Sequence, residues 1–284
     1  MAPADDRTEP VEAAPLLCLK ALPSLAGRRA ALLVAHAPGG RLKPNVPPYV
    51  AALAKAGVAV VLVAATDAVL HVDPGVAAQL DCIYARGNRG YDFAAWAHLL
   101  KAEPSLSEAA TLYLINDSVI GPMSQSALER LLARVDANPA AIVGATESFE
   151  ITWHLQSYFI AVKHAALGSE PFRRFIASVR SQTIKRAVIL GYEVPMARTL
   201  KRAGLSCSVA HPSIDALNPL VFHWRAMIES GFPFAKTIVL SGFYPKLDIS
   251  GWQDTLRAAG FDPTIAEAAI GASRPAIPVR VAAS

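Results

Sequence analysis

The sequence has little charge for its length. Only 18% of its 284 residues are charged and 53% are hydrophobic, whereas soluble domains typically have ~25% charged and ~45–50% apolar residues. This composition excludes an intrinsically disordered chain and a coiled coil. The length permits one large α/β domain, and the apolar excess predicts strands that are buried on both faces of a sheet.

Cysteine is also scarce. Cys18, Cys82 and Cys207 are far apart and form no CxxC pair, so neither a disulfide framework nor a zinc site is indicated. Reduced, unpaired cysteines are typical of the cytoplasm. The N-terminus is acidic and carries no apolar segment of a secretory signal. We therefore expect a cytoplasmic protein.

Long apolar runs are missing, although the mean hydropathy is +0.32. The most apolar stretches cover residues 51–63 and 58–66, but Lys55 interrupts the first and Asp67 follows the second. A membrane-spanning helix needs roughly 20 apolar residues without such breaks. The hydrophobicity is therefore expected to lie in the core.

Several common motifs are absent. The sequence contains no GxxxxGK[ST], no GxSxG, no HExxH and no GxGxxG after its first apolar run. A P-loop, a hydrolase elbow, a zinc protease site and a dinucleotide fingerprint are thereby excluded. The net charge of +4 suits a phosphorylated ligand or an anionic membrane surface, and no motif indicates nucleic-acid binding.

Apolar runs and helical patterns alternate along the chain. Residues 31–37 and 58–65 predict buried strands around a helix at 49–56, which is a βαβ unit with parallel pairing. The same pattern predicts further strands at 82–85, 111–115, 141–144 and 156–162, and helices at 93–101, 124–135, 172–179 and 195–203. The expected architecture is an α/β fold with a mostly parallel sheet flanked by helices. We divide the chain into a lead-in at 1–27 with a loose start, a single domain at 28–245, and a C-terminal extension at 246–284, whose Ala/Pro-rich end from 263 is expected to wrap the domain or to be mobile.

Polar residues follow the predicted strands, where open α/β sheets bind ligands. Asp117 comes directly after the strand at 111–115, and a carboxylate there can hold a divalent cation that neutralises a diphosphate. The spacing alone favours a simpler interpretation of residues 116–118, as a helix N-cap or an Asx turn between the strand and the next segment. Likewise Asp92 is typical of a helix N-cap, Glu193 of a first-turn carboxylate, and His154 of a structural histidine.

Six segments in fixed order carry a family resemblance. They are 86–96 (RGNRGYDFAAW), 114–123 (LINDSVIGPM), 144–148 (GATES), 154–159 (HLQSYF), 191–193 (GYE) and 231–236 (GFPFAK). Together they resemble the rhamnan synthesis protein F family, whose members look like glycosyltransferases of bacterial surface polysaccharides. The resemblance runs from about Leu32 to Lys236. It implies a GT-A-like layout with a Rossmann-like nucleotide-binding half.

The resemblance also implies roles for individual residues. His36, Thr66 and Asp67 fall where such enzymes contact the nucleobase and ribose. The remaining residues are expected to orient the donor (Arg86, Asn88, Gly90, Asp92), to replace the metal-binding Asp-x-Asp motif (Asn116, Asp117, Ser118), to hold the acceptor or donor sugar (His154, Gln156), and to act as the catalytic base (Glu193). The motif has one carboxylate instead of two, so Mg²⁺ or Mn²⁺ is expected to bind Asp117 loosely or mostly through the diphosphate.

These features predict an inverting glycosyltransferase, in particular a rhamnosyltransferase. Its partners would be a nucleoside diphosphate sugar such as dTDP-rhamnose and a glycan or lipid-linked glycan acceptor, at the inner face of the plasma membrane. The alternative is a non-catalytic relative that binds a glycan or a partner enzyme in a polysaccharide assembly complex. An α/β hydrolase or phosphatase with Asp117 as nucleophile is a third possibility that no accompanying motif supports.

Overall fold

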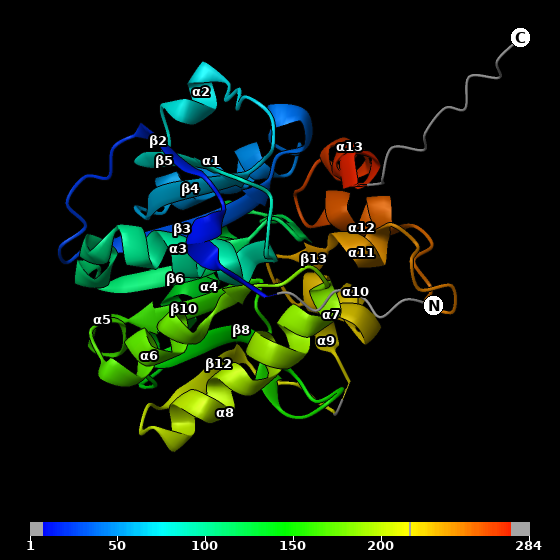
Figure 1. Ribbon diagram of the computed structural model, residues 1–284. Coiled ribbons are helices and arrows are strands. Elements are labelled where there is room, and N and C mark those ends of the chain that lie inside the picture. The colour runs from blue at the N-terminus through cyan, green and yellow to red at the C-terminus, as the bar shows by residue number, and fades with distance from the viewer. Residues whose placement is uncertain (1–7, 216, 274–284) are drawn as a thin grey trace, which may run out of the picture.

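A nine-stranded sheet forms the centre of the computed structural model, which describes residues 8–215 and 217–273 (Figure 1). The strand order is β2-β5-β4-β3-β6-β10-β8-β12, and β9 pairs with β8 outside this path. The strands are β2 (Leu16–Lys20), β3 (Arg29–His36), β4 (Ala59–Ala65), β5 (Cys82–Arg86), β6 (Thr111–Asn116), β8 (Ile142–Ser148), β9 (His154–Leu155), β10 (Phe159–Lys163) and β12 (Cys207–His211).

The sheet is mostly parallel. Strand β3 pairs in parallel with β4 and β6, β4 with β5, and β8 with β12. Strand β10 is antiparallel to both β6 and β8, and the edge strand β2 is antiparallel to β5. Along this path only β2 and β10 run against the common direction. The α/β class and the mostly parallel sheet flanked by helices are confirmed.

Strand β3 shows why the strands are continuous apolar runs. Successive side chains of a strand point to opposite faces. Ala30, Leu32 and Val34 therefore join the hydrophobic cluster on one face, and the residues between them join the cluster on the other. Both faces are covered by helices, so the strand is apolar on both.

Helices from different parts of the chain cover the two faces. α3 (Tyr91–Ala102), α6 (Glu170–Ser178) and α8 (Val194–Arg202) contribute Trp96, Phe175 and Leu200 to the first cluster. α1 (Val46–Lys55) and α4 (Gln125–Ala137) contribute to the second. Shorter elements connect them: β1 (Glu9–Pro10), β7 (Val119–Ile120), β11 (Arg180–Ser181), β13 (Ala235–Lys236), α2 (Pro74–Ala77), α5 (His164–Leu167) and α7 (Lys185–Val188).

The last helices form a third hydrophobic cluster, on the right-hand side of Figure 1. They are α9 (Pro219–Phe222), α10 (Trp224–Glu229), α11 (Thr237–Leu240), α12 (Trp252–Ala258) and α13 (Pro263–Ser273). Residues 263–273, expected to wrap the domain or to be mobile, form a helix because Ala266, Ala269 and Ile270 are buried against this cluster. Residues 274–284 lie outside the described part. The division at 28 and 245 stays a prediction.

Two local expectations are corrected. The expected strand at 156–162 begins at Phe159, because residues 156–158 turn. The short strand β9 before this turn pairs separately with β8. The start of the chain is less loose than expected from residue 8 onward: Glu9–Pro10 pair with β11, and Val11 is fully buried. Within the described residues, no helix is long and apolar enough to cross a membrane.

Candidate functional site

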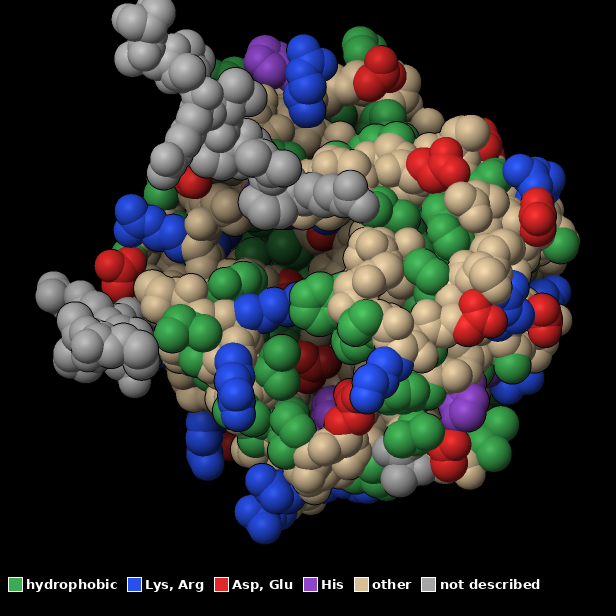
Figure 2. Space-filling view, turned by 90° about the vertical axis from the view of Figure 1, so that its right-hand side faces the viewer, with side chains coloured by type: hydrophobic (Ala, Val, Ile, Leu, Met, Phe, Trp, Pro, Cys, Tyr) green, Lys and Arg blue, Asp and Glu red, His purple; other side chains and the backbone are tan. Residues whose placement is uncertain are grey.

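A cavity of about 680 Å³ opens at the carboxyl ends of the central strands. Val34 and His36 at the end of β3, Ala65 at the end of β4 and Asn116 at the end of β6 line it. Figure 2 shows this hollowed face, with acidic side chains at its depth and Lys and Arg side chains around it. Ligands of open α/β sheets bind at this edge.

Most of the expected site residues meet in this cavity. The lining includes His36, Asn88, Asp92, Asn116, Asp117, Ser118, His154, Gln156 and Glu193. Thr66, Asp67, Arg86 and Gly90 are not part of the lining. The cavity therefore unites segments that are more than 150 residues apart in the sequence.

The segment Asn116–Asp117–Ser118 is a tight polar turn. The Asn116 side-chain oxygen accepts hydrogen bonds from the Ser118 backbone N–H (3.1 Å) and hydroxyl (2.6 Å). The Asn116 amide group donates to Asp92 Oδ2 at 2.6 Å. This is an Asx turn, one of the two simpler interpretations of the spacing, and it also places Asp117 at the cavity.

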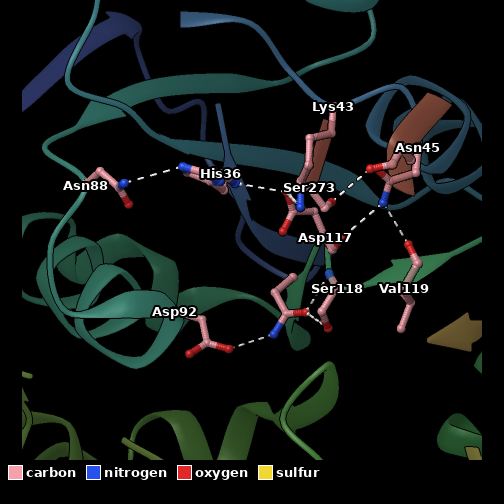
Figure 3. Close-up of polar contacts among 11 residues, drawn as sticks. His36, Lys43, Asn45, Asn88, Asp92, Asp117, Ser118, Val119 and Ser273 are labelled. Atoms are coloured by element: carbon pink, nitrogen blue, oxygen red, sulfur yellow. Dashed lines mark hydrogen bonds and ion pairs between the residues drawn. The ribbon is translucent and has the colours of Figure 1, made fainter. Parts of the chain in front are cut away.

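Asp117 is held by an ion pair (Figure 3). Its Oδ2 lies 2.8 Å from Lys43 Nζ and accepts a hydrogen bond from the His36 backbone N–H at 3.0 Å. The side chains of Lys43 and Asp117 are only 10% and 11% exposed. The nearby Asn45 side chain donates to the backbone oxygens of Asp117 and Val119, which fixes the loop that carries Lys43.

The residues around Asp117 do not fit a protein-bound divalent cation. Asp117 is the single carboxylate of the turn, and its Oδ2 already accepts from an ammonium group and a backbone N–H. Hard cations such as Mg²⁺ and Ca²⁺ take several oxygen ligands. Across residues 8–215 and 217–273 no group of three His, Cys, Asp or Glu side chains could hold a metal.

Asp92 lies in the first turn of α3, where it faces a second carboxylate. Burial, and secondarily the charge of Glu193, raise the pKa of Asp92 to about 6. The Phe93 backbone N–H and the Asn116 amide act in the opposite direction by donating to the carboxylate. A carboxyl with a raised pKa in a cavity marks a functional-site candidate.

Glu193 ends a short π-helix, Ile189–Glu193, that joins α7 to α8. Single π-helical turns are rare in proteins, and those that occur are often found at functional sites. The Ser157 backbone N–H donates to Glu193 Oε1 at 2.9 Å, which fixes the carboxylate at the cavity wall.

A polar cluster orients the same wall of the cavity. The Thr146 hydroxyl donates to Gln156 Oε1 at 2.7 Å and lies 2.8 Å from the Tyr158 hydroxyl. His154 Nδ1 lies 2.7 Å from the Thr152 backbone oxygen. Because a carbonyl oxygen only accepts, Nδ1 must carry the proton, which leaves Nε2 as an acceptor in the neutral ring.

Arg86 has a different place from the one expected. It is 1% exposed, and its guanidinium donates to the backbone oxygens of Gly87 and Val11, both at 3.1 Å, and of Arg89. These contacts tie the turn after β5 to the N-terminal segment. Arg86 therefore shapes the loop that carries Asn88 instead of facing a ligand in the cavity.

The other three residues outside the lining support the same loops. Asp67 accepts from the Asn88 backbone N–H at 2.9 Å, and the Thr66 hydroxyl oxygen accepts from the Ala68 backbone N–H at 3.1 Å. Gly90 lines a smaller neighbouring cavity and caps α3 with a positive φ of 77°.

The cavity also contains residues that the sequence did not single out. They include three lysines, Lys43, Lys185 and Lys236. Lys236 ends the GFPFAK segment, so its family motif was visible but its position was not. Lys43 stands in a Pro- and Gly-rich loop, where no local pattern indicates that its partner is the distant Asp117.

The solved structures to which the chain is similar include two sugar transferases. A proposed nucleotide-diphospho-sugar transferase from Desulfovibrio desulfuricans G20 is 11% identical, with 84% of this chain and 96% of that chain covered and a TM-score of 0.40. A mannosyltransferase from Pyrobaculum calidifontis, in complex with GDP-Man and Mn²⁺, is 14% identical, with 92% and 80% covered and a TM-score of 0.40.

A search of curated proteins found no match. The family model of rhamnan synthesis protein F matches residues 73–247, which is more than half of the chain. The matched range includes the turn at Asn116–Ser118 and the carboxylates Asp92 and Glu193. The chain therefore belongs to the rhamnan synthesis protein F family.

Proposed function

We propose that this protein is an inverting glycosyltransferase, which moves a sugar from a nucleoside diphosphate donor to a growing surface glycan. The observation that carries the proposal is that the assigned residues meet in one cavity. Residues assigned to the donor, such as Asn88 and Asp92, and the residue assigned as base, Glu193, line one cavity at the carboxyl ends of the strands. Family membership supports the same activity.

Glu193 is the proposed catalytic base. Its carboxylate takes the proton of an acceptor hydroxyl, and the hydroxyl oxygen forms a bond to the anomeric carbon. The bond from that carbon to the diphosphate breaks on the opposite side, and the nucleoside diphosphate leaves with the electron pair. The proton ends on Glu193. The anomeric carbon passes through an oxocarbenium-like state, as in other glycosyl transfers.

We assign different parts of the substrates to the two walls of the cavity. His36 and Asn88 lie at or just after the ends of the strands β3 and β5, and we assign them to the nucleoside. His154 and Gln156 belong to the wall that carries Glu193, and we assign them to the donor sugar or the acceptor. The expected Mg²⁺ or Mn²⁺ enters no step, because the residues around Asp117 do not fit it.

We further propose rhamnose as the transferred sugar, dTDP-rhamnose as its donor and a lipid-linked glycan as acceptor. The family name supports the first two. An apolar rim supports the third: Tyr91, Ile151 and Ile238 line the cavity but remain 37–58% exposed. Such a rim suits an acceptor with an apolar part and peripheral association with the inner face of the plasma membrane.

Titration of the protein with a panel of nucleotide sugars that includes dTDP-rhamnose tests the proposal. We expect binding of at least one donor and transfer to a glycan acceptor. Failure to bind any donor would overturn it. Binding of a glycan without any affinity for sugar nucleotides would point to the non-catalytic relative instead.

Glu193→Gln tests the assigned base. The substitution keeps the shape and the acceptor for Ser157 but cannot take a proton, so we expect turnover to fall by at least ~100-fold while donor affinity is retained. Glu229→Gln, on the exposed end of α10, is the matched control and should transfer normally. Full turnover by the Glu193→Gln protein would refute the role of base.

A further inference from the structure

Two lysines approach the turn at Asn116–Ser118 from different parts of the chain. Lys43 comes from the loop between β3 and α1, and its ammonium pairs with Asp117 at 2.8 Å. The Asn45 amide ties this loop to the backbone on both sides of Ser118. Lys43 therefore has a fixed position, with its ammonium at the cavity wall.

Lys236 is fixed beside the same turn by β-pairing. Strand β13 is antiparallel to β7, with Lys236 opposite Val119 and Ala235 opposite Ile120. The Thr237 backbone N–H donates to the Ser118 backbone oxygen at 3.0 Å. Lys236 is half-buried at the cavity wall, and the described residues place no carboxylate within 4 Å of its ammonium.

The charges at this turn leave little attraction for a divalent cation. Lys43 already neutralises Asp117 at short range, and a cation that bound Asp117 would have to displace this ammonium from a nearly buried ion pair. Breaking such a pair leaves an uncompensated charge and is strongly unfavourable. A diphosphate, in contrast, can accept hydrogen bonds from Lys43 without breaking the pair, because an ammonium has three donors.

Ammonium groups at this turn can supply the positive charge that a bound cation would supply. The diphosphate gains negative charge as the bond to the anomeric carbon breaks, and preorganised positive groups at that point stabilise it. Lysine is a common phosphate ligand that acts as a point charge. Lys43 and Lys236 flank the turn, and both line the cavity.

We infer that Lys43 and Lys236 bind the donor diphosphate in the place expected for a divalent cation, so that nucleotide binding needs no metal. The inference rests on the proposed function. Lys43 and Lys236 touch the diphosphate, and Asp117 is a positioning residue that holds the Lys43 ammonium.

Calorimetric titration with dTDP, UDP and GDP, in EDTA and in excess Mg²⁺ or Mn²⁺, tests the inference on the unaltered protein. We expect at least one of these nucleotides to bind with the same affinity, within about twofold, under both conditions. Binding that requires the metal would overturn the inference and leave the proposed function standing. Binding of none of the three, with or without metal, would count against both, and absence of binding of the full nucleotide-sugar panel would overturn the proposed function itself.

Lysine variants give the second test. In EDTA, Lys43→Met and Lys236→Met should each weaken nucleotide binding by about 10- to 100-fold, as expected for loss of a hydrogen bond to a charged group. Lys55→Met, at the exposed end of α1, should bind normally. Lys43→Arg keeps the charge and should recover part of the affinity, and it remains informative if Lys43→Met does not fold. Unchanged affinity of folded Lys236→Met would remove Lys236 from the site.

Discussion

The raised pKa of Asp92 should make the stability of the folded protein depend on pH. Its pKa is raised from 3.8 to about 6, mainly by burial and then by the charge of Glu193. Lys185 is the facing cation, and it acts weakly in the opposite direction. The folded protein therefore holds this proton more tightly than the unfolded chain does. The resulting stabilisation is complete below about pH 4 and is lost as the pH rises through about 6.

Asp92→Asn should remove this pH dependence. The neutral amide cannot ionise, so the free energy of unfolding of the variant should fall by about 2 kcal/mol less than that of the wild type between about pH 4 and pH 6. Urea unfolding across this range measures the difference. Asp254→Asn changes a carboxylate that is 82% exposed and should leave the profile unchanged. Parallel profiles for Asp92→Asn and wild type would contradict the burial of a proton at Asp92.

At the scale of elements, the start of α3 is a tightly constrained part of the backbone beside the cavity. Gly90 caps the helix with φ of 77°, and Tyr91, which lines the cavity, also has a positive φ of 59°. A Cβ on Gly90 would lie 2.5 Å from Ala94 Cβ and 2.8 Å from Ser181 Cα. Glycine is therefore required here by both conformation and space.

Gly90→Ala should consequently destabilise the protein by about 3 kcal/mol, since strain at positive φ and overpacking each cost ~1–3 kcal/mol. Chemical denaturation measures this loss. Gly271→Ala, in α13, meets no atom within 4 Å and should raise stability by about 0.5–1 kcal/mol. Equal effects of the two substitutions would show that α3 can shift to accept a side chain.

The sequence predicted the inner elements well because their patterns are local. The strands β3, β4 and β6 each contain a continuous apolar run, and the structure ends them close to the expected positions. Strand β2 was missed because Leu17 and Leu19 stay about half exposed at the sheet edge, without an alternating pattern to mark them. Strand β10 begins later than expected because contacts with Thr146 hold the residues before it in a turn.

The site was predicted less completely, because it depends on contacts between distant segments, which no local pattern shows. Strand ends indicate a sheet edge, so Asp92, Asn116 and Asp117 could be placed there from the order of elements. The partner of Asp117 could not, because the Lys43 loop is set by distant backbone oxygens. Arg86 was misplaced because an arginine after a strand gives no sign of which carbonyl groups will surround it.

At the scale of the whole molecule, the C-terminal helices share a core with the rest. Leu256 of α12 is fully buried in the third cluster, together with Ile120 and Met123 from the region of β7. Leu256→Ala should therefore lower the free energy of unfolding by about 2–5 kcal/mol, in one cooperative transition. Calorimetry would reveal a separate early transition if residues 246–284 were an independent extension.

Leu19→Ala is the control for this experiment. Leu19 is 49% exposed on the edge strand β2, and exposed substitutions usually change stability by less than ~0.5 kcal/mol. A loss for Leu256→Ala no larger than this would show that the third cluster contributes little.

The pairing of β7 with β13 means that the site cannot be complete until both strands have been synthesised. Val119 and Lys236 are neighbours in this pairing although they are far apart in the sequence, and a ribosome delivers the chain from its N-terminus onward. A nascent chain that has emerged as far as Glu193 already carries Asp92 and Asp117 but not Lys236. The growing polypeptide therefore possesses every carboxylate assigned to the reaction before it possesses the second lysine assigned to the diphosphate. The complete anion site exists only after Lys236 has been synthesised.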